Sequence, residues 1–366
     1  MRGIVRLLPC VLGLCATACS LVGDFDFSGY DEAPGLVDAS DARADVHKDS
    51  SLPDTSKPDT AEPTDGSGND SVADSSDAEE PIGQFIYGIA GQSCTPTSMC
   101  GKTNQASCCD AQWIPKTSFT IGGTGSGTSA GSYPEHSGTV SAFRLDTYEV
   151  TVGRFRRFVR AFDGTPPAQG RGEHPKIAGS GWSSSWNSFL PADRTAFMTA
   201  LHCGTSSNTS TWTDSPGDNE ARPVNCVTWY EAFAFCLWDG ARLATNAEWE
   251  CAAKGGEENR RYPWGSAAPN ATLVAYQCSW SLPITSCDLS DIPNVGHADG
   301  KGRWGQYDLA GSIYEWVLDS VSSAWYTGGG SNCVDCANFE DPNYAAQRGG
   351  YWGATEPNLR TYDAFV

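Results

Sequence analysis

One stretch of the sequence determines the fold class, Ala241-Arg-Leu-Ala-Thr-Asn-Ala-Glu-Trp-Glu-Cys-Ala-Ala253. Thr245 and Glu248 have the capping-box spacing, in which a hydroxyl and a carboxylate bind the amides that a helix start leaves unpaired. A helix therefore begins near Thr245, and the glycines at 255 and 256 end it. The preceding stretch, Thr228-Trp-Tyr-Glu231, carries the same signal, and Gly240 ends that helix.

Outward from these two helices, the sequence predicts short strands and long loops. Residues 113–123 and 140–150 alternate apolar and polar side chains, as strands do. A helix with aromatic residues on one side begins near Thr151, whereas residues 163–222 show little periodicity. From Tyr262 onward, glycines interrupt a series of turns and short strands. The pattern predicts an α+β domain with little regular secondary structure and no internal repeat.

The negative charge is concentrated ahead of this domain. The chain has 24 Lys and Arg against 44 Asp and Glu, a net charge of −20. Residues 20–80 hold 17 of the acids and three bases, which is −14, while all 13 tryptophans lie at or after Trp113. The absence of a basic cluster excludes nucleic acid as an expected partner, because phosphate neutralisation needs Lys and Arg. No 18-residue apolar run follows the N-terminus, so a membrane-spanning protein is not expected.

Residues 1–18 are predicted to be a signal peptide, because a basic start and an apolar run precede Ala16-Thr-Ala18. A cut there exposes Cys19, and the pattern resembles the bacterial lipoprotein signal, although Ala16 stands where that signal favours Leu. We therefore expect an acyl group on Cys19 and a disordered acidic linker at 19–82. The protein would be exported and anchored to membrane lipid, at the periplasmic face or the cell surface. An ordinary secretory peptide cut nearby is the alternative.

The cysteine count predicts a disulfide framework. Fifteen cysteines are present, and an even twelve remain beyond residue 19, which in an exported protein indicates disulfides without fixing their pairing. Residues 83–112 hold four and are expected to form a small cysteine-rich lobe ahead of a main domain at 113–366. Cys333-Val-Asp-Cys336 also fits a zinc half-site or a redox pair, but no second CxxC accompanies it, so a structural disulfide is favoured. The twelve candidates are Cys94, Cys100, Cys108, Cys109, Cys203, Cys226, Cys236, Cys251, Cys278, Cys287, Cys333 and Cys336.

Metal-binding and phosphate-binding motifs are missing. The five histidines form no HExxH or HxxxH pair, and no GxxxxGK loop occurs. Glu231, Glu248 and Glu250 could act as general acids, but their positions near helix starts favour capping or solvation.

Six segments in order resemble the formylglycine-generating (sulfatase-modifying factor) family. The resemblance implies a fold related to C-type lectin domains over residues 113–366, rich in loops. The resemblance does not determine the function, because the family contains both enzymes and binding or structural proteins. The matching segments are Phe143-Arg-Leu-Asp-Thr-Tyr-Glu-Val-Thr151, residues 223–232, residues 241–253, Tyr262-Pro-Trp-Gly265, Gly305-Gln-Tyr-Asp-Leu-Ala-Gly-Ser-Ile-Tyr-Glu-Trp316 and Arg348-Gly-Gly-Tyr-Trp352.

The resemblance argues against copper. Family enzymes hold copper with two cysteines downstream of the Arg-Gly-Gly segment, and the matching positions here are Ala354 and Leu359. Neither side chain can bind Cu(I), which prefers thiolates. The chain is also expected to stop at Val366, short of the family's closing strand.

The resemblance also suggests calcium. Relatives bind this ion through backbone carbonyls and a glutamate, and the matching residues are Ala310, Gly311, Ile313 and Glu315, with Ser312 in place of the family's Asn. Oxygen ligands of this kind suit Ca²⁺.

The resemblance, the loss of both copper-ligand positions and the lipoprotein-like signal together predict a surface-anchored, non-catalytic binding or scaffold domain with a peptide or protein ligand. The alternative is an oxidoreductase of the sulfatase-modifying factor or non-haem iron type that acts on a peptide or protein. The iron-dependent branch carries a His-x3-His-x-Glu ligand set, and this chain has no such motif.

Overall fold

The computed structural model describes residues 91–123, 134–204, 209–280, 287–322, 325, 328–339 and 342–365, and the backbone of 15–17 and 19–20. The chain divides into two units, residues 1–29 with 89–366 and residues 30–88. The second unit, most of the expected linker and the Cys19 side chain lie outside the described residues. Among the helices that are described, none is long and apolar enough to cross a membrane.

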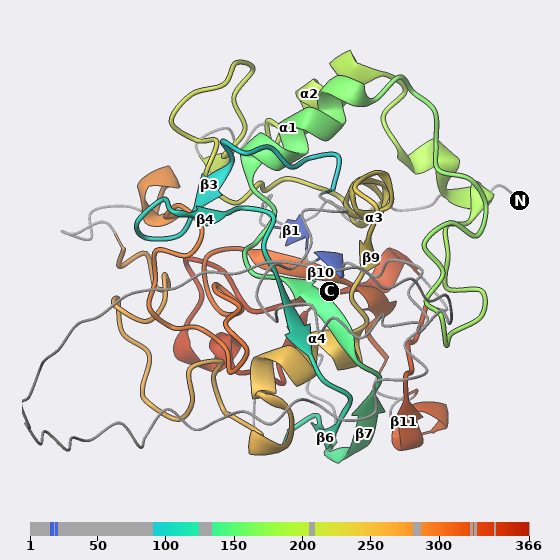
Figure 1. Ribbon diagram of the computed structural model, residues 1–366, viewed down its shortest axis with the longest axis vertical. Coiled ribbons are helices and arrows are strands. Elements are labelled where there is room, and N and C mark those ends of the chain that lie inside the picture. The colour runs from blue at the N-terminus through green and yellow to red at the C-terminus, as the bar shows by residue number, and fades with distance from the viewer. Residues whose placement is uncertain are drawn as a thin grey trace, which may run out of the picture. The chain divides into compact units, whose positions relative to one another are not determined.

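The folded unit is organised around strand β10 (Tyr314–Ser320), near the centre of Figure 1. β12 (Ala345–Arg348) pairs with it antiparallel, and β13 (Ala364–Phe365) pairs with β12. Residues 364–365 are thus an edge strand of this sheet, and the expectation that the chain lacks the family's closing strand stays a prediction. On the other side, β1 (Cys15–Thr17) runs parallel to β10. A chain cut before Cys19 would lack β1, and that cut stays a prediction.

β10 separates two apolar cores because its side chains alternate between faces. Trp316 and Leu318 belong to one core, and Val317 belongs to the other. In β12 the neighbours Ala345 and Ala346 divide in the same way.

The first core is aromatic and helical. It contains α1 (Val152–Ala161), α2 (Arg194–Ala200) and α3 (Trp229–Trp238), which lie together in the upper part of Figure 1. Phe155 of α1 stacks on Phe235 of α3 with ring centroids 5.2 Å apart. The expected helix starts at 151 and 228 are confirmed, with Thr151 and Thr228 as N-caps.

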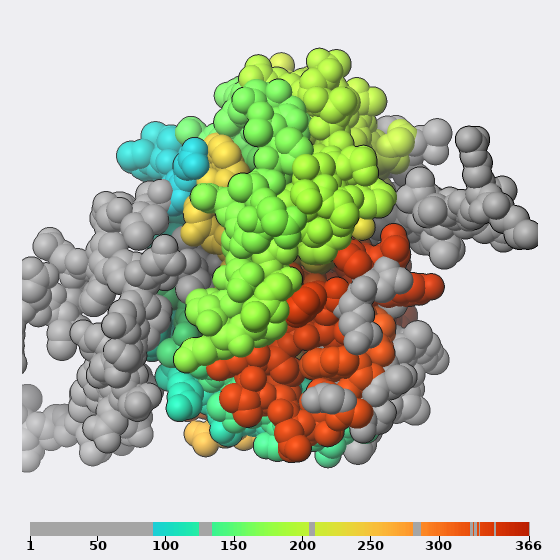
Figure 2. All heavy atoms as spheres, turned by 90° about the vertical axis from the view of Figure 1, so that its right-hand side faces the viewer, coloured from blue at the N-terminus to red at the C-terminus, as the bar shows by residue number. Residues whose placement is uncertain are grey.

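The connection at 163–222 contains more structure than its sequence indicates. Asp193 caps α2, and a 3-10 helix, η1 (Ser184–Phe189), precedes it. Figure 2 shows much of this segment, in green to yellow-green, against the orange-red C-terminal segments. Its stability comes from packing, because Trp182 and Phe197 are fully buried.

The second core lies between α4 (Asn246–Lys254) and short strands, in the lower part of Figure 1. β5 (Ala111–Ile114) pairs with β8 (Phe143–Asp146), and β6 (Thr117–Ile121) pairs with β7 (His136–Val140). The single strand expected at 113–123 is thus two strands. Pro115 separates them, since proline has no amide hydrogen to donate to a sheet.

The remaining elements are short. They are β2 (Cys19–Ser20), β3 (Met99–Cys100), β4 (Ala106–Ser107), β9 (Arg242–Leu243), β11 (Cys333–Val334), η3 (Gly256–Glu258), η4 (Leu289–Asp291), η5 (Gly329–Asn332), η6 (Pro342–Tyr344) and η7 (Glu356–Leu359). The expected fold class is confirmed: helices and sheets are mixed, and much of the chain is irregular.

The disulfide framework is also present. Five bridges join Cys94 to Cys109, Cys100 to Cys108, Cys203 to Cys226, Cys278 to Cys287 and Cys333 to Cys336. Cys236 is disulfide-bonded as well. Cys251 is the exception among the candidates: it is a free thiol, and it lies on α4, fully buried in the second core.

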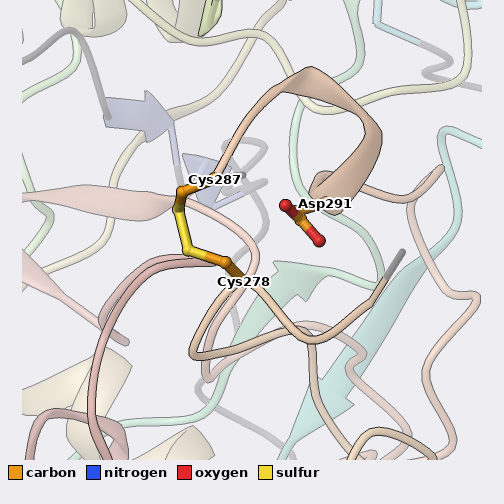
Figure 3. A group of neighbouring side chains, drawn as sticks. All are labelled: Cys278, Cys287 and Asp291. Atoms are coloured by element: carbon orange, nitrogen blue, oxygen red, sulfur yellow. A yellow bond between two sulfur atoms is a disulfide. The ribbon is translucent and has the colours of Figure 1, made fainter. Parts of the chain in front are cut away.

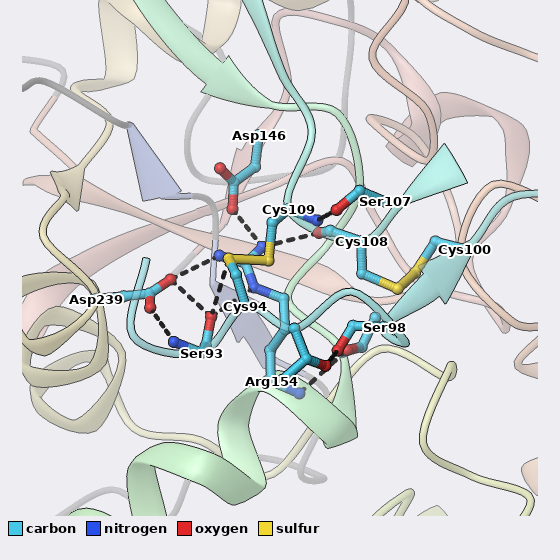
Figure 4. The surroundings of a disulfide bond; sticks show 12 residues. Ser93, Cys94, Ser98, Cys100, Ser107, Cys108, Cys109, Asp146, Arg154 and Asp239 are labelled. Atoms are coloured by element: carbon cyan, nitrogen blue, oxygen red, sulfur yellow. Dashed lines mark hydrogen bonds and ion pairs between the residues drawn. A yellow bond between two sulfur atoms is a disulfide. The ribbon is translucent and has the colours of Figure 1, made fainter. Parts of the chain in front are cut away.

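The cysteine-rich segment packs directly against the main domain. Ser93 donates to Asp239 at the end of α3, and Arg154 of α1 donates to the carbonyl of Cys108 (Figure 4). Cys100, Cys108, Tyr148 and Val295 form a small apolar cluster of their own. This segment is therefore part of the folded unit.

Candidate functional site

The two positions that the resemblance assigns to copper ligands lie together in an apolar cluster. Ala354 is 2% exposed and Leu359 is 0% exposed, and both pack with Tyr262 and Val274. A Cβ placed on Gly350 would lie 3.4 Å from Ala354 Cβ and 3.3 Å from Leu359 Cδ2, so the two side chains are neighbours. No atom of either can bind a metal ion.

Half-buried aromatic rings lie beside this cluster. The ring of Tyr314 lies 5.3 Å from that of Tyr351 and 5.0 Å from that of Phe365, centroid to centroid. We call these three residues the aromatic surface. Tyr351 also contacts buried Trp352, whose indole nitrogen has no hydrogen-bond partner. Rings that are half exposed offer contact area to a ligand with little loss of side-chain entropy.

Charged residues contact Tyr262, which belongs to the same apolar cluster as Ala354 and Leu359. Tyr262 stacks on Trp264 at 5.2 Å between centroids, and its hydroxyl donates to Glu356. Arg261 and Arg360 both form ion pairs with Glu356, at 3.0 and 3.5 Å. Charges of both signs therefore lie beside the Ala354–Leu359 cluster.

A second feature is a small cavity, with space for roughly one water molecule, lined by carboxylates. Its lining residues are Leu145, Asp146, Tyr148, Glu149, Tyr307, Leu309 and Glu315. Asp146 is neutralised by Arg154 at 2.6 Å, while its other oxygen has no hydrogen-bond partner. Glu149 and Glu315 make no ion pair among the described residues, and neither does the neighbouring Asp308.

Only neutral donors bind these three carboxylates. Glu149 accepts from the Ser312 hydroxyl at 3.0 Å and from the Ile313 amide at 3.3 Å. Glu315 accepts from the indole of Trp249 at 2.7 Å. Asp308 accepts from the amide of Gly296 at 2.6 Å.

Burial raises the pKa of all three groups. Burial raises the pKa of Glu315 to about 8 and that of Asp308 to about 7. Burial, with the charges of Asp308 and Glu315, raises the pKa of Glu149 well above its ordinary value. We call Glu149, Asp308 and Glu315 the acidic cluster.

The residues expected to bind calcium lie around this cluster. Ala310 and Ile313 are buried, and Gly311 has φ +72° with no room for a side chain, since a Cβ there would lie 2.2 Å from the Ala275 carbonyl. Ser312, which stands in place of the family's Asn, donates a hydrogen bond from its hydroxyl to Glu149. Sequence reasoning named Glu315 but missed Glu149 and Asp308. Both residues lie inside the segments that carry the family resemblance, at 143–151 and 305–316. Acidic residues between apolar ones in these segments were the signal that could have indicated buried carboxylates.

The other acids considered have structural partners. Glu231 and Glu248 complete capping boxes with Thr228 and Thr245. Glu248 also binds Arg242 at 2.6 Å, and Glu250 binds Arg348 at 2.6 Å. These contacts support their reading as structural residues.

Comparisons with known proteins give the family. A profile described as "Sulfatase-modifying factor enzyme 1-like domain" matches residues 97–364. The chain belongs to this family. It is 28% identical to "Inactive C-alpha-formylglycine-generating enzyme 2" of Mus musculus over 58% of this chain and 69% of that protein. It is also 28% identical to the "Formylglycine-generating enzyme" of Thermomonospora curvata, over 58% of this chain and 72% of that one. Among solved structures, PvdO from Pseudomonas aeruginosa matches with a TM-score of 0.44 and 22% identity, covering 69% of this chain and 86% of that one.

The acidic cluster predicts how stability depends on pH when no metal is bound. A raised carboxyl pKa means that the folded state keeps a proton that the unfolded chain releases above about pH 4.5. The free energy of unfolding of chelator-treated protein should therefore fall as the pH rises from about 5 to about 8. In Glu315→Gln the fall should be smaller by at least about 1.4 kcal/mol, the equivalent of one pKa unit. Denaturant titrations at each pH measure it.

Glu258→Gln is the matched control, because Glu258 is partly exposed and paired with Arg260 and Arg303. It should retain the parent's slope. Identical slopes in the parent and in Glu315→Gln would contradict the charged-cluster interpretation.

Proposed function

We propose that this chain is a non-catalytic binding domain of an exported protein, with a peptide or protein segment as its ligand. The apolar environment of Ala354 and Leu359 carries the proposal. A copper enzyme of this family needs soft thiolate ligands there, and an alanine and a leucine supply none.

The aromatic surface is the proposed ligand site. Tyr314, Tyr351 and Phe365 come from β10, from the loop after β12 and from β13, so the central sheet holds them rigidly. Half-exposed rings suit the apolar side chains of an extended peptide.

The disulfides indicate an exported protein, since cytosolic thiols are kept reduced.

We also propose that an acyl group on Cys19 anchors the exported protein to the membrane. A Cys19→Ala chain should leave the membrane fraction and appear as soluble protein, whereas the parent should stay with the membrane. Partition of both chains into detergent measures this, and membrane retention of Cys19→Ala would refute the anchor.

Copper-dependent formylglycine formation is expected to be absent. The purified domain is incubated with a sulfatase-type cysteine peptide, copper and oxygen, and the product is weighed. The peptide mass should stay unchanged, because no thiolate holds Cu(I) where oxygen would be activated. Aldehyde above a no-protein control would overturn the non-catalytic proposal in favour of the oxidoreductase.

The same peptide tests the ligand site, and two variants serve as controls. Tyr351→Ala should weaken peptide binding about tenfold, whereas Tyr344→Ala, a 54% exposed tyrosine outside the aromatic surface, should not. Equal loss in both tyrosine variants would refute the assigned surface.

A double variant, Ala354→Cys with Leu359→Cys, should gain copper binding that the parent lacks.

We further propose that a calcium ion binds at the acidic cluster. We propose Glu315 and the carbonyl oxygens of Gly311 and Ile313 as its ligands, because hard oxygen ligands suit Ca²⁺. A divalent cation there would also offset the charges of the nearby Glu149 and Asp308. The proposal rests on the cavity next to Glu149 and Glu315 and on the lack of a described cationic partner.

Calcium should therefore raise the thermal midpoint of the parent near pH 8 and should raise that of Glu315→Gln much less. A ligand at a hundred times its Kd stabilises the folded state by about 2.7 kcal/mol. Glu258→Gln should respond like the parent. An equal shift in all three proteins would place the ion elsewhere, and no shift in the parent would refute a calcium site.

A further inference from the structure

One disulfide differs from the other four that the structure describes. Cys287 is exposed, and every other cysteine of those five bridges is buried or half-buried. The Cys278–Cys287 bridge is therefore the first that a reductant in solution would reach.

A carboxylate lies directly beside this bridge. Asp291, fully buried in η4, has an oxygen that lies within 4.8 Å of both sulfur atoms, which are also within that distance of each other. Figure 3 shows Asp291 on the turn that follows Cys287, next to the two joined sulfurs. Among the described residues, this is the only group of three potential metal ligands at such distances.

We propose that the reduced form of this chain binds a thiophilic divalent cation such as Zn²⁺ through Cys278, Cys287 and Asp291. Tetrahedral zinc with bonds of about 2.3 Å to sulfur and about 2.0 Å to oxygen places its ligand atoms roughly 3.5–4 Å apart. The three ligand atoms already lie within 4.8 Å of one another. In the oxidised form the sulfurs are bonded to each other and bind no metal.

Asp291 distinguishes a metal site from a redox-active pair. A disulfide exchange centre needs a thiolate stabilised by positive charge, and a neighbouring carboxylate disfavours the thiolate. The same carboxylate favours a divalent cation, which offsets two thiolates and one carboxylate together. The local charge therefore supports metal binding over thiol exchange.

The conversion balances with a dithiol as the reductant. The dithiol supplies two electrons and two protons, its own sulfurs become a disulfide, and Cys278 and Cys287 become thiols. Binding of the cation then releases the two thiol protons, and Asp291 binds as a carboxylate.

The site would couple to the loop that carries Tyr351, one residue of the aromatic surface. The Cys278 amide donates to the Trp352 carbonyl at 2.8 Å, and the Gln277 amide donates to the Ala354 carbonyl at 3.1 Å. A Cβ on Gly353 would lie 3.3 Å from Cys287 Sγ. Opening the bridge and binding a cation would therefore act directly on residues 352–354.

The test uses Cd²⁺ as a spectroscopic probe of thiolate ligands. The full chain is treated with increasing amounts of a dithiol, excess reductant is removed, and Cd²⁺ is titrated while the thiolate-to-metal absorption is recorded. Mass spectrometry after alkylation identifies the opened bridges, and near-UV circular dichroism reports the fold. The parent is compared with the double variant Cys278→Ser with Cys287→Ser, with Asp291→Asn, and with the control Cys203→Ser with Cys226→Ser.

The reduced parent and the Cys203/Cys226 control should bind one more Cd²⁺ than the Cys278/Cys287 variant. Asp291→Asn should bind that ion at least about tenfold more weakly, and the oxidised parent should not bind it. Equal stoichiometry in the parent and the Cys278/Cys287 variant would overturn the proposal. It would also be overturned if another bridge opened first or if the fold were lost before Cys278 and Cys287 became thiols.

Discussion

The buried guanidinium of Arg154 is the interaction on which the rest of the domain depends. It extends from α1 and binds Asp146 of β8 at 2.6 Å and Asp239, the last residue of α3's cap, at 2.8 Å. It also binds the hydroxyl of Ser93, so four separate segments meet at one side chain (Figure 4). Loss of the arginine would leave two buried carboxylates without a cationic partner, which typically costs about 3–5 kcal/mol. Its partner Asp146 lines the acidic cavity, so this contact also positions the candidate calcium site.

The same rule of charge pairing explains why the acidic cluster stands out. Glu248 is paired with Arg242 and Glu250 with Arg348, although all four are buried. These pairs hold the pKa of both glutamates below the usual value despite burial. Glu149, Asp308 and Glu315 are equally buried and have no such partner among the described residues. The acidic cluster differs from the buried Glu231, which also has no ion pair among the described residues, because it brings several buried carboxylates together next to a cavity.

Local signals in the sequence predicted part of this structure, and distance along the chain explains what they missed. The capping boxes at Thr228 and Thr245 depend on residues three positions apart, so the sequence alone located both helices. The acidic cluster joins residues 149, 308 and 315, and no local pattern brings them together. Disulfide pairing has the same limit, because the count indicated oxidation but could not show that burial in α4 leaves Cys251 free. The sequence analysis expected one strand at 113–123, although Pro115 could have indicated the division, because a missing amide hydrogen is a local property.

Ala354 and Leu359 are the positions at which this chain differs from the copper enzymes that its family resemblance suggests. In an enzyme, two thiolates at these positions would be polar groups that need a metal ion or hydrogen bonds when they are buried. Alanine and leucine need neither, and they pack with Tyr262 and Val274 in a continuous apolar cluster. An alanine and a leucine at these positions therefore leave the surrounding fold without an unpaired charge. A fold does not by itself determine function, so family membership is compatible with an enzyme and with a binding protein. The apolar contacts of Ala354 and Leu359 are the local feature that favours the proposed binding role.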